Sequence, residues 1–500
     1  MSKATKKIGR FSFGILLCFM ISGLACANFV NSPSEIEVWR LNDYENIHEL
    51  TTVKNLLLFE GYMKNDSIDC RCVYAVEKTS GELVWSTEEI AQPHIEEKQD
   101  DPSWNVNWAG LVEIVSVSSA DNIVYVVINY ESLYALNSID GQPIWKIDNL
   151  EYASLNDDTF TDDGIFVVNN SGNLMKLDKF TGEEQWKQSV VQNVDDHPVW
   201  SYYLDHLILA EVYHLEGNQL FAFETNTGKG IWKTNITSMD PYAFEGDAIY
   251  FDNSSKEFWK EGKRLTSINL GTGEVIWDFT IQKSARLLWP TVIGEYLYLV
   301  TDRVENSKST SKLIALGSRT GNLLWQFNQE FSPSLDVTVK KIQDDVIYIG
   351  TESGFVFALD RIGGQEIWRA KLPSAPSSFF IEGNRLVVIC KLNCISGLDS
   401  KTGSQEWLLN IDIDTVLTSD QFDPGDVTNL HDGILCGIDK PGVYAVDINT
   451  GKVLWLWNHD SLYPWHRGYD SGLVDKDIVY VVGGESPFDI AGSGLFALKK

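Results

Sequence analysis

A thirteen-residue pattern recurs nine times along this 500-residue chain. Its first copy, residues 73–85 (VYAVEKTSGELVW), is an apolar run with a small residue at its centre, a turn that contains Gly, and a Trp four residues after that Gly. Successive copies of this Trp are 39 to 60 residues apart. Repeats of about this length are typical of propeller blades, so we expect one repeat domain rather than several unrelated ones.

Each period contains four runs that have the character of β-strands. Residues 111–117, 123–128, 132–137 and 143–147 are short, rich in β-branched and aromatic residues, and bounded by Gly, Asp or Asn. They predict a four-stranded antiparallel blade. The repeated Trp then fills the space between blades, burying roughly 200 Å² of ring surface in each copy. The predicted blade-packing residues are Trp85, Trp145, Trp186, Trp232, Trp277, Trp325, Trp368, Trp407 and Trp455.

The two ends of the chain carry complementary fragments of the repeat. Residues 35–41 look like the end of a repeat without its beginning, whereas residues 478–482 and 495–498 look like middle strands without the Gly and Trp that should follow. A blade assembled from both ends would close a ring and remove its exposed sheet edges. Nine copies and one closing blade favour ten blades, within an expected range of eight to ten.

The copies share one order of residues: a strand such as Leu-Tyr-Ala-Leu, an Asp or Asn, two residues, Thr-Gly, three residues and Trp. This order resembles the PQQ-type propeller repeat. The resemblance covers about residues 35–500 and implies an all-β chain folded as a single β-propeller. Proteins with this repeat include quinoprotein alcohol dehydrogenases, the outer-membrane assembly lipoprotein and exported proteins that bind no quinone. The resemblance is therefore specific for the fold and says little about function.

The first 27 residues have the pattern of an export signal, since four basic residues precede an apolar run that is short for a membrane-spanning helix. Leu24-Ala25-Cys26 resembles a bacterial lipobox, in which Cys26 would become the lipidated first residue. Ordinary cleavage before Asn28 and an uncleaved signal anchor are the alternatives. We expect residues 28–34 to be a linker, residues 35–500 to form the propeller, and the exported protein to be a monomer.

The net charge of the chain excludes some classes of partner. A net charge of −30 argues against nucleic acid and against an anionic membrane surface as direct partners, because both are bound through Lys and Arg. Contact with a membrane is expected only through a lipid or signal anchor.

Cys390 and Cys394 flank a predicted tight hairpin, where a cross-strand disulfide is geometrically feasible in an exported protein. The alternative is thiols without any bridge, and we expect at most one disulfide.

The insertions in this chain fall in the connections from strand four to the next strand one and from strand two to strand three, which share one face of a propeller. That face is the predicted functional one. Its candidate binding residues are Trp104, Trp108, Trp289, Trp465, His466 and Arg467. Aromatic and polar side chains of this kind suit recognition of another protein or a glycan. The alternative is that these Trp residues pack their own loops against the ring.

The parts of a quinoprotein dehydrogenase are not evident. The resemblance would imply an adjacent Cys pair against the quinone, a Ca²⁺ site built from a carboxylate and an Asn, and a catalytic Asp. The sequence contains no adjacent Cys pair, and Cys70-Arg-Cys72 is the nearest approach. We assign no catalytic, cofactor-binding or metal-ligating residue and expect no cofactor. The sequence thus favours an exported non-catalytic binding platform, with a divergent PQQ- and Ca²⁺-dependent dehydrogenase and an envelope assembly scaffold as alternatives.

Overall fold

The computed structural model describes residues 37–499 except residues 64–70, 92–111, 130, 151, 156–158, 192–196, 205, 214–217, 238–240, 253–262, 282–284, 306–307, 332–337, 344, 392–393, 411–428, 432, 440–441, 459–471, 476–477 and 484–493. Within this part of the chain, no helix is long and apolar enough to cross a membrane.

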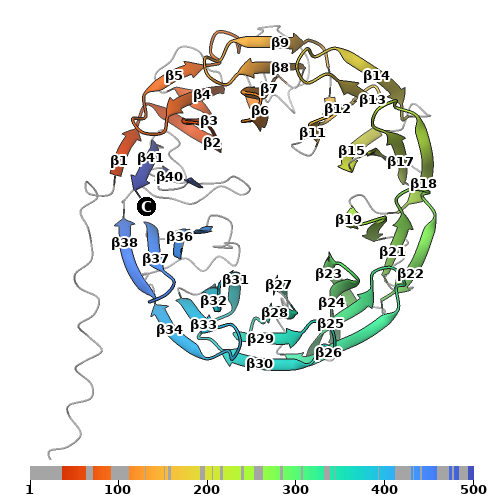
Figure 1. Ribbon diagram of the computed structural model, residues 1–500, viewed down its shortest axis with the longest axis vertical. Helices are drawn as coiled ribbons and strands as arrows, with labels where there is room; N and C mark the ends of the chain where they lie inside the picture. The colour runs from red at the N-terminus through yellow and green to blue at the C-terminus, as the bar shows by residue number, and fades with distance from the viewer. Residues whose placement is uncertain are drawn as a thin grey trace, which may run out of the picture.

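Ten antiparallel sheets stand around a ring, as the repeat count favoured (Figure 1). The first strand of each blade lies toward the centre of the ring and the fourth lies at its outer rim. The prediction of an all-β propeller with four-stranded blades is confirmed. In the third blade the inner position is shared by two short strands, which both pair with the next strand.

The first four blades follow one another in the sequence. The first consists of β2 (Tyr44–Val53), β3 (Leu56–Met63), β4 (Cys72–Glu77) and β5 (Leu83–Ser86), and the second of β6 (Val112–Ser118), β7 (Ile123–Ile128), β8 (Ser132–Asn137) and β9 (Pro143–Ile147). The third consists of β10 (Tyr152–Ser154), β11 (Phe160–Thr161), β12 (Gly164–Asn169), β13 (Asn173–Leu177) and β14 (Glu184–Ser189), and the fourth of β15 (His197–Leu204), β16 (Leu207–Tyr213), β17 (Asn218–Glu224) and β18 (Gly230–Ile236).

The next five blades continue around the ring. The fifth consists of β19 (Pro241–Glu245), β20 (Ala248–Asp252), β21 (Arg264–Asn269) and β22 (Val275–Thr280), and the sixth of β23 (Ala285–Ile293), β24 (Tyr296–Glu305), β25 (Lys308–Gly317) and β26 (Leu323–Phe331). The seventh consists of β27 (Thr338–Gln343), β28 (Val346–Gly350), β29 (Phe355–Asp360) and β30 (Glu366–Lys371). The eighth consists of β31 (Pro376–Glu382), β32 (Arg385–Cys390), β33 (Cys394–Asp399) and β34 (Gln405–Asn410), and the ninth of β35 (Asn429–His431), β36 (Ile434–Asp439), β37 (Gly442–Asp447) and β38 (Lys452–Asn458).

The tenth blade closes the ring with strands from both ends of the chain. β1 (Glu37–Leu41) pairs with β41 (Gly494–Lys499), which pairs with β40 (Ile478–Gly483) and then with β39 (Gly472–Asp475). Trp39 lies opposite Ala497, as the repeated Trp lies opposite the small residue in other blades. Lys78 Nζ of the first blade is 2.5 Å from Asp475 Oδ2 of the tenth. Strand pairing between β1 and β41 and the ion pair between Lys78 and Asp475 therefore both join the two ends of the chain.

The repeated Trp residues lock each blade onto the next one. Trp232 of the fourth blade, for example, packs against Gly273 of the fifth so closely that a Cβ on this glycine would lie 2.6 Å from Trp232 Cδ2. Its Nε1–H donates to the Leu270 carbonyl at 2.8 Å. The same two contacts are made by Trp39, Trp85, Trp145, Trp186, Trp277, Trp325, Trp368 and Trp407, each to the blade that follows. The repeat thus encodes a contact between blades.

Trp455 departs from this rule. Its Nε1 is buried and has no hydrogen-bond partner among the described residues. In the other blades the acceptor is the carbonyl three residues after the small residue of the third strand, such as Ser318 after Ala315. The equivalent position after Ala497 is Lys500, which lies outside the described residues.

A β-bulge precedes the repeated Trp in every blade. The register of the third and fourth strands shifts at this point, so the residue before the Trp has no partner opposite it. Eight of the ten bulged residues are aliphatic and 40–49% exposed: Val38, Val84, Ile144, Ile231, Ile276, Leu324, Ile367 and Leu454. Bulges bend an edge strand and interrupt its pairing surface, which protects the outer rim from pairing with other sheets.

Candidate binding face

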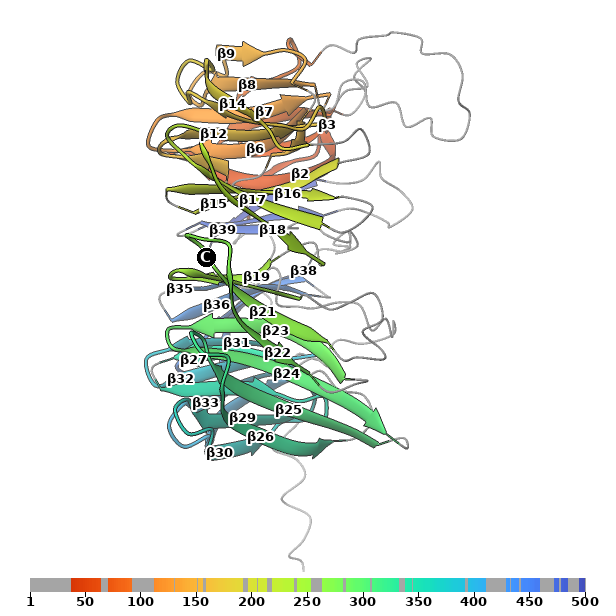
Figure 2. The same cartoon turned by 90° about the vertical axis from the view of Figure 1, so that its right-hand side faces the viewer.

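The longest connections all leave one face of the ring. Those from strand four to strand one include residues 87–111, 411–428 and 459–471, and those from strand two to strand three include residues 253–263 and 484–493. The opposite face has short turns, such as residues 54–55 between β2 and β3. On the side of the long connections, β24 to β26 extend beyond the other blades (Figure 2). This arrangement agrees with the face that the sequence predicted to be elaborated.

Most of the predicted binding residues lie outside the described part of the chain. Trp104, Trp108, Trp465, His466 and Arg467 belong to this group. Trp289 lies in β23, the inner strand of the sixth blade, where the pairing with β24 shifts register between Leu288 and Thr291.

Both ends of the 87–111 connection are fastened to the first blade. At its start, Thr87 is 1% exposed, its N–H donates to the Val73 carbonyl at 3.0 Å, and its Oγ1 accepts the Val73 N–H at 2.9 Å. At its end, the Val112 N–H donates to the Arg71 carbonyl at 2.9 Å. The two ends of the longest connection are therefore bonded to Val73 and Arg71, which lie two residues apart at the start of the third strand. The connection thus has a fixed base.

A buried ion pair lies beside these stems. Glu60, in the middle of β3, is completely buried, and one of its carboxylate oxygens pairs with Arg71 Nη2. The other accepts the Ile114 N–H of β6 at 2.6 Å. Burial raises the pKa of Glu60 to about 7, although the charge of Arg71 and the Ile114 hydrogen bond act in the opposite direction. Sequence reasoning missed this group, although a carboxylate inside an apolar second strand was a visible signal.

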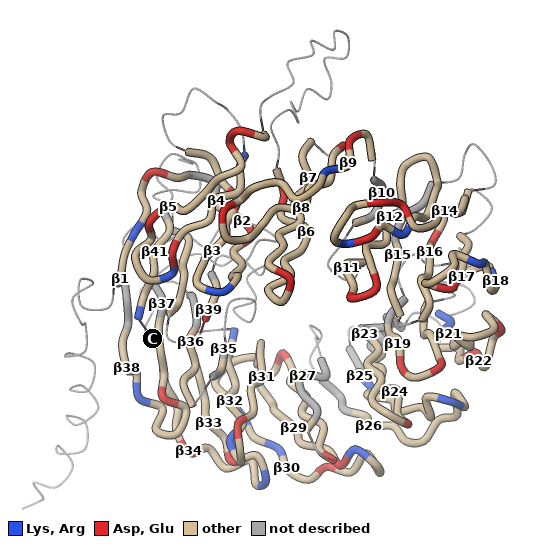
Figure 3. Tube along the Cα trace, turned by 45° about the horizontal axis from the view of Figure 1, so that its top comes forward, with Lys and Arg blue, Asp and Glu red and all other residues tan. Residues whose placement is uncertain are grey.

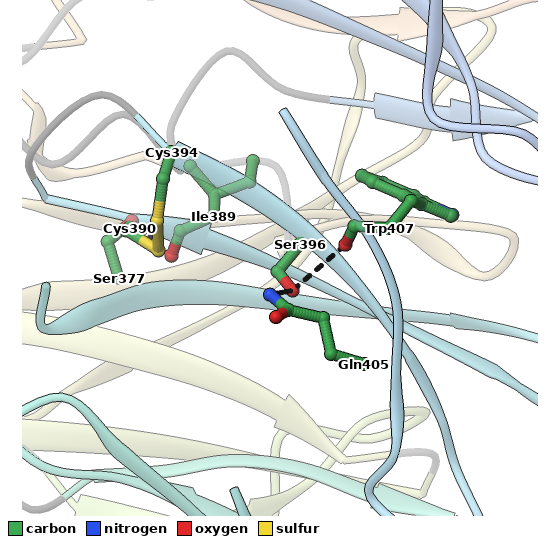
Figure 4. The surroundings of a disulfide bond; sticks show 7 residues. All are labelled: Ser377, Ile389, Cys390, Cys394, Ser396, Gln405 and Trp407. Atoms are coloured by element: carbon green, nitrogen blue, oxygen red, sulfur yellow. Dashed lines mark hydrogen bonds between the residues drawn. A yellow bond between two sulfur atoms is a disulfide. The ribbon is translucent and has the colours of Figure 1, made fainter. Parts of the chain in front are cut away.

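A disulfide joins the two strands of the eighth blade at the same face. Cys390, the last residue of β32, and Cys394, the first of β33, are 5.1 Å apart between their Cα atoms (Figure 4). Nearby, Ser396 Oγ accepts from Gln405 Nε2 at 2.9 Å and donates to the Trp407 carbonyl at 3.3 Å. Cys72, the first residue of β4, is also disulfide-bonded. The expectation of at most one disulfide is therefore wrong.

Charge does not single out one part of the ring. The chain has 70 acidic and 40 basic residues, and acidic positions are spread around the blades (Figure 3). Among the described residues, no group of three or more His, Cys, Asp or Glu side chains is arranged to hold a metal ion. The described part of this face thus offers anchored loop stems, one buried ion pair and a disulfide.

Comparison with known proteins agrees with the repeat. The family model described as "Outer membrane protein assembly factor BamB" matches residues 71–247, 153–288 and 309–458. The chain belongs to this family of PQQ-type repeat proteins. The resemblance inferred from the repeat pattern is confirmed.

The relatives include an assembly factor, several dehydrogenases and a tetrathionate hydrolase. The outer membrane protein assembly factor BamB of Shewanella oneidensis is 24% identical over 320 residues, which cover 60% of this chain and 72% of that protein. The polyvinylalcohol dehydrogenase of Sphingopyxis sp. is 19% identical over 65% of this chain and 56% of its own, and the quinoprotein ethanol dehydrogenase of Pseudomonas putida is 22% identical over 62% and 51%. The chain thus spans about half the length of the dehydrogenases it matches.

The crystal structure of BamB from Moraxella catarrhalis is 16% identical, with a TM-score of 0.34, and the match covers 71% of this chain and 96% of that one.

Proposed function

We propose that this chain is an exported, non-catalytic binding platform that holds a partner protein on the face of its long connections. The observation that carries the proposal is the fastening of both stems of the 87–111 connection to the first blade, through Thr87 and Arg71. A fixed base lowers the entropy lost when a loop orders on a partner. The family match and the BamB relative support a role in protein recognition over a glycan, and an envelope assembly scaffold is the narrower form of this function.

Export and anchoring are part of the proposal. The first 27 residues are proposed to direct export, and Cys26 to carry a lipid in the mature protein. The intact mass of the protein purified from its own host tests this step. An acylated chain that begins at Cys26 supports the anchor, whereas a chain that begins at Asn28 replaces it with ordinary secretion.

A divergent quinoprotein dehydrogenase is the second candidate, favoured by the similarity to dehydrogenases over more than 60% of this chain. We expect the purified protein to have no quinone absorbance band and an unchanged melting temperature when PQQ and Ca²⁺ are added. A ligand at a hundred times its Kd would stabilise the folded state by about 2.7 kcal/mol. A quinone band, or a rise of several degrees in the melting temperature, would place the dehydrogenase first.

The binding proposal predicts that Trp104 acts in recognition. Trp104→Ala is expected to change the free energy of unfolding by under about 1 kcal/mol, as for a substitution away from the core, and to reduce capture of the partner from a host envelope extract. Ile144→Ala is the matched control, because Ile144 is an exposed rim residue that is 48% accessible. Equal capture by the two variants would count against this face as the binding site.

A further inference from the structure

Glu60 occupies a repeat position that is apolar in most other blades. It lies opposite Val73, two residues before the small Ala75 of the third strand. The equivalent residues in the second, sixth and eighth blades are Val127, Val300 and Ile389, whereas the fourth and fifth blades have Glu211 and Asp252. Side chains here are directed toward the next blade, as the Glu60 contact with Ile114 of β6 demonstrates. A carboxylate at this position is therefore confined between two blades.

Three segments meet at the Glu60 carboxylate. It lies on β3, Arg71 immediately precedes β4, and Ile114 belongs to β6 of the second blade. The Arg71 side chain is 13% exposed, and its carbonyl also accepts the Val112 N–H. Arg71 Nε is buried without a hydrogen-bond partner among the described residues. Arg71 is thus held by its Nη2 contact with Glu60 and has a second donor that this arrangement leaves unused.

The charged neighbours of Glu60 act in both directions. Arg71 stabilises its ionised form, whereas Glu49 of β2 and Glu113 of β6 oppose ionisation. His48 of β2 is the residue paired in register with Glu60. Burial is the largest influence and also opposes ionisation, because a charge confined between blades loses its hydration. The balance brings the pKa of Glu60 to about 7.

We propose that Glu60 and Arg71 form a proton-operated latch within the first blade, beside its contact with the second. Above neutral pH the ionised carboxylate holds Arg71 and the Ile114 N–H together. On acidification the carboxyl takes a proton from solvent, its carbonyl oxygen keeps the Ile114 hydrogen bond, and the ion pair with Arg71 is lost. Arg71, which remains charged, then moves toward water, and its side chain no longer ties the start of β4 to β3.

The latch also fixes the sign of a stability effect. An ordinary Glu side chain has a pKa of 4.5, whereas Glu60 in the folded protein has a pKa of about 7. Between these values the folded state keeps a proton that the unfolded state has lost, so the unfolding free energy contributed by Glu60 falls as the pH rises through this window. It is constant above about pH 7. Formation of the ion pair with Arg71 therefore accompanies a loss of unfolding free energy, as expected for a conformational device rather than a stabilising ion pair.

The test is an NMR titration of the full chain labelled with ¹⁵N-isoleucine, in which the Ile114 amide is assigned by Ile114→Val. The wild-type resonance is expected to titrate with a midpoint near pH 7, and Glu60→Gln is expected to abolish the titration. Arg71→Met should raise the midpoint by about one unit or more, since an opposite charge in contact lowers an acid's pKa by about one to three units. Arg71→Lys, which keeps the charge, should move it less and serves if Arg71→Met does not fold.

Glu406→Gln provides the control, because Glu406 is an exposed carboxylate that pairs with Arg385 in the eighth blade. It should leave the Ile114 midpoint unchanged. A midpoint at or below pH 5, or a midpoint that both Arg71 variants leave where it was, would overturn the latch. Neither result depends on whether the protein binds a partner, so the proposed function is tested separately.

Discussion

Replacement of Trp277 by Ala is expected to lower the free energy of unfolding by about 3–5 kcal/mol, the range for removing a large aromatic side chain from a core. Trp277 is 8% exposed and fills the interface between the fifth and sixth blades. Its Nε1–H donates to the Ser318 carbonyl at 2.8 Å, which Tyr250 also reaches with its hydroxyl at 3.2 Å. Truncation would leave a cavity against Gly321 and remove one of these two donors.

The matched control for Trp277 is the residue before it. Ile276→Ala changes the bulged residue of the same strand, which is 41% exposed on the outer rim. We expect a loss of under about 1 kcal/mol, because a surface position loses little buried area. Urea denaturation followed by far-UV circular dichroism measures both variants. Similar losses for the two residues would mean that the repeated Trp does not hold the blades together.

Gly273→Ala is expected to destabilise the protein by about 2–5 kcal/mol, through two separate effects. Gly273 has a φ of +71°, a left-handed conformation that costs an L-residue about 1–2 kcal/mol. An added Cβ would also lie 2.6 Å from Trp232 Cδ2 and Cε3, and overpacking of this kind costs about 1–3 kcal/mol. The indole cannot retreat without losing its hydrogen bond to the Leu270 carbonyl.

Gly246 separates these two effects within the same blade. It also has a left-handed φ, +60°, but nothing lies within 4 Å of the Cβ that an alanine would add. Gly246→Ala should therefore show only the conformational cost of about 1–2 kcal/mol. Thermal melts of the two variants at one pH give the comparison. If Gly273→Ala were no more damaging than Gly246→Ala, close approach of the indole would not be the reason for glycine in the repeated turn.

The sequence alone determined the blade and the closure of the ring. The residues that form one blade, such as Ala75, Gly81 and Trp85, lie close together along the chain, so their spacing is visible as a repeat. Residues 35–41 could be recognised as an incomplete repeat for the same reason. Counting copies then favoured ten blades. Local patterns suffice because nine of the ten blades fold from consecutive strands, and the repeated Trp contact joins most neighbouring blades in the same way.

Only the tertiary structure reveals how residues that differ from the repeat are accommodated. Lys176 occupies the small position opposite Trp186 in the third blade, where it is buried with its Nζ 5.6 Å from the centre of the Phe166 ring. Phe166 stands where Tyr125 stands in the preceding blade, so the ring next to this lysine carries no hydroxyl. The sequence displays both residues, but only packing places them together.

The candidate site depended on the tertiary structure even more. Glu60 and Ile114 are 54 residues apart, and their contact forms only when the second blade packs against the first. The pKa of Glu60 is raised by that burial, which no local pattern records. The sequence determined the repeated framework because repetition is local, whereas the buried ion pair and its proton affinity follow from two blades excluding water between them.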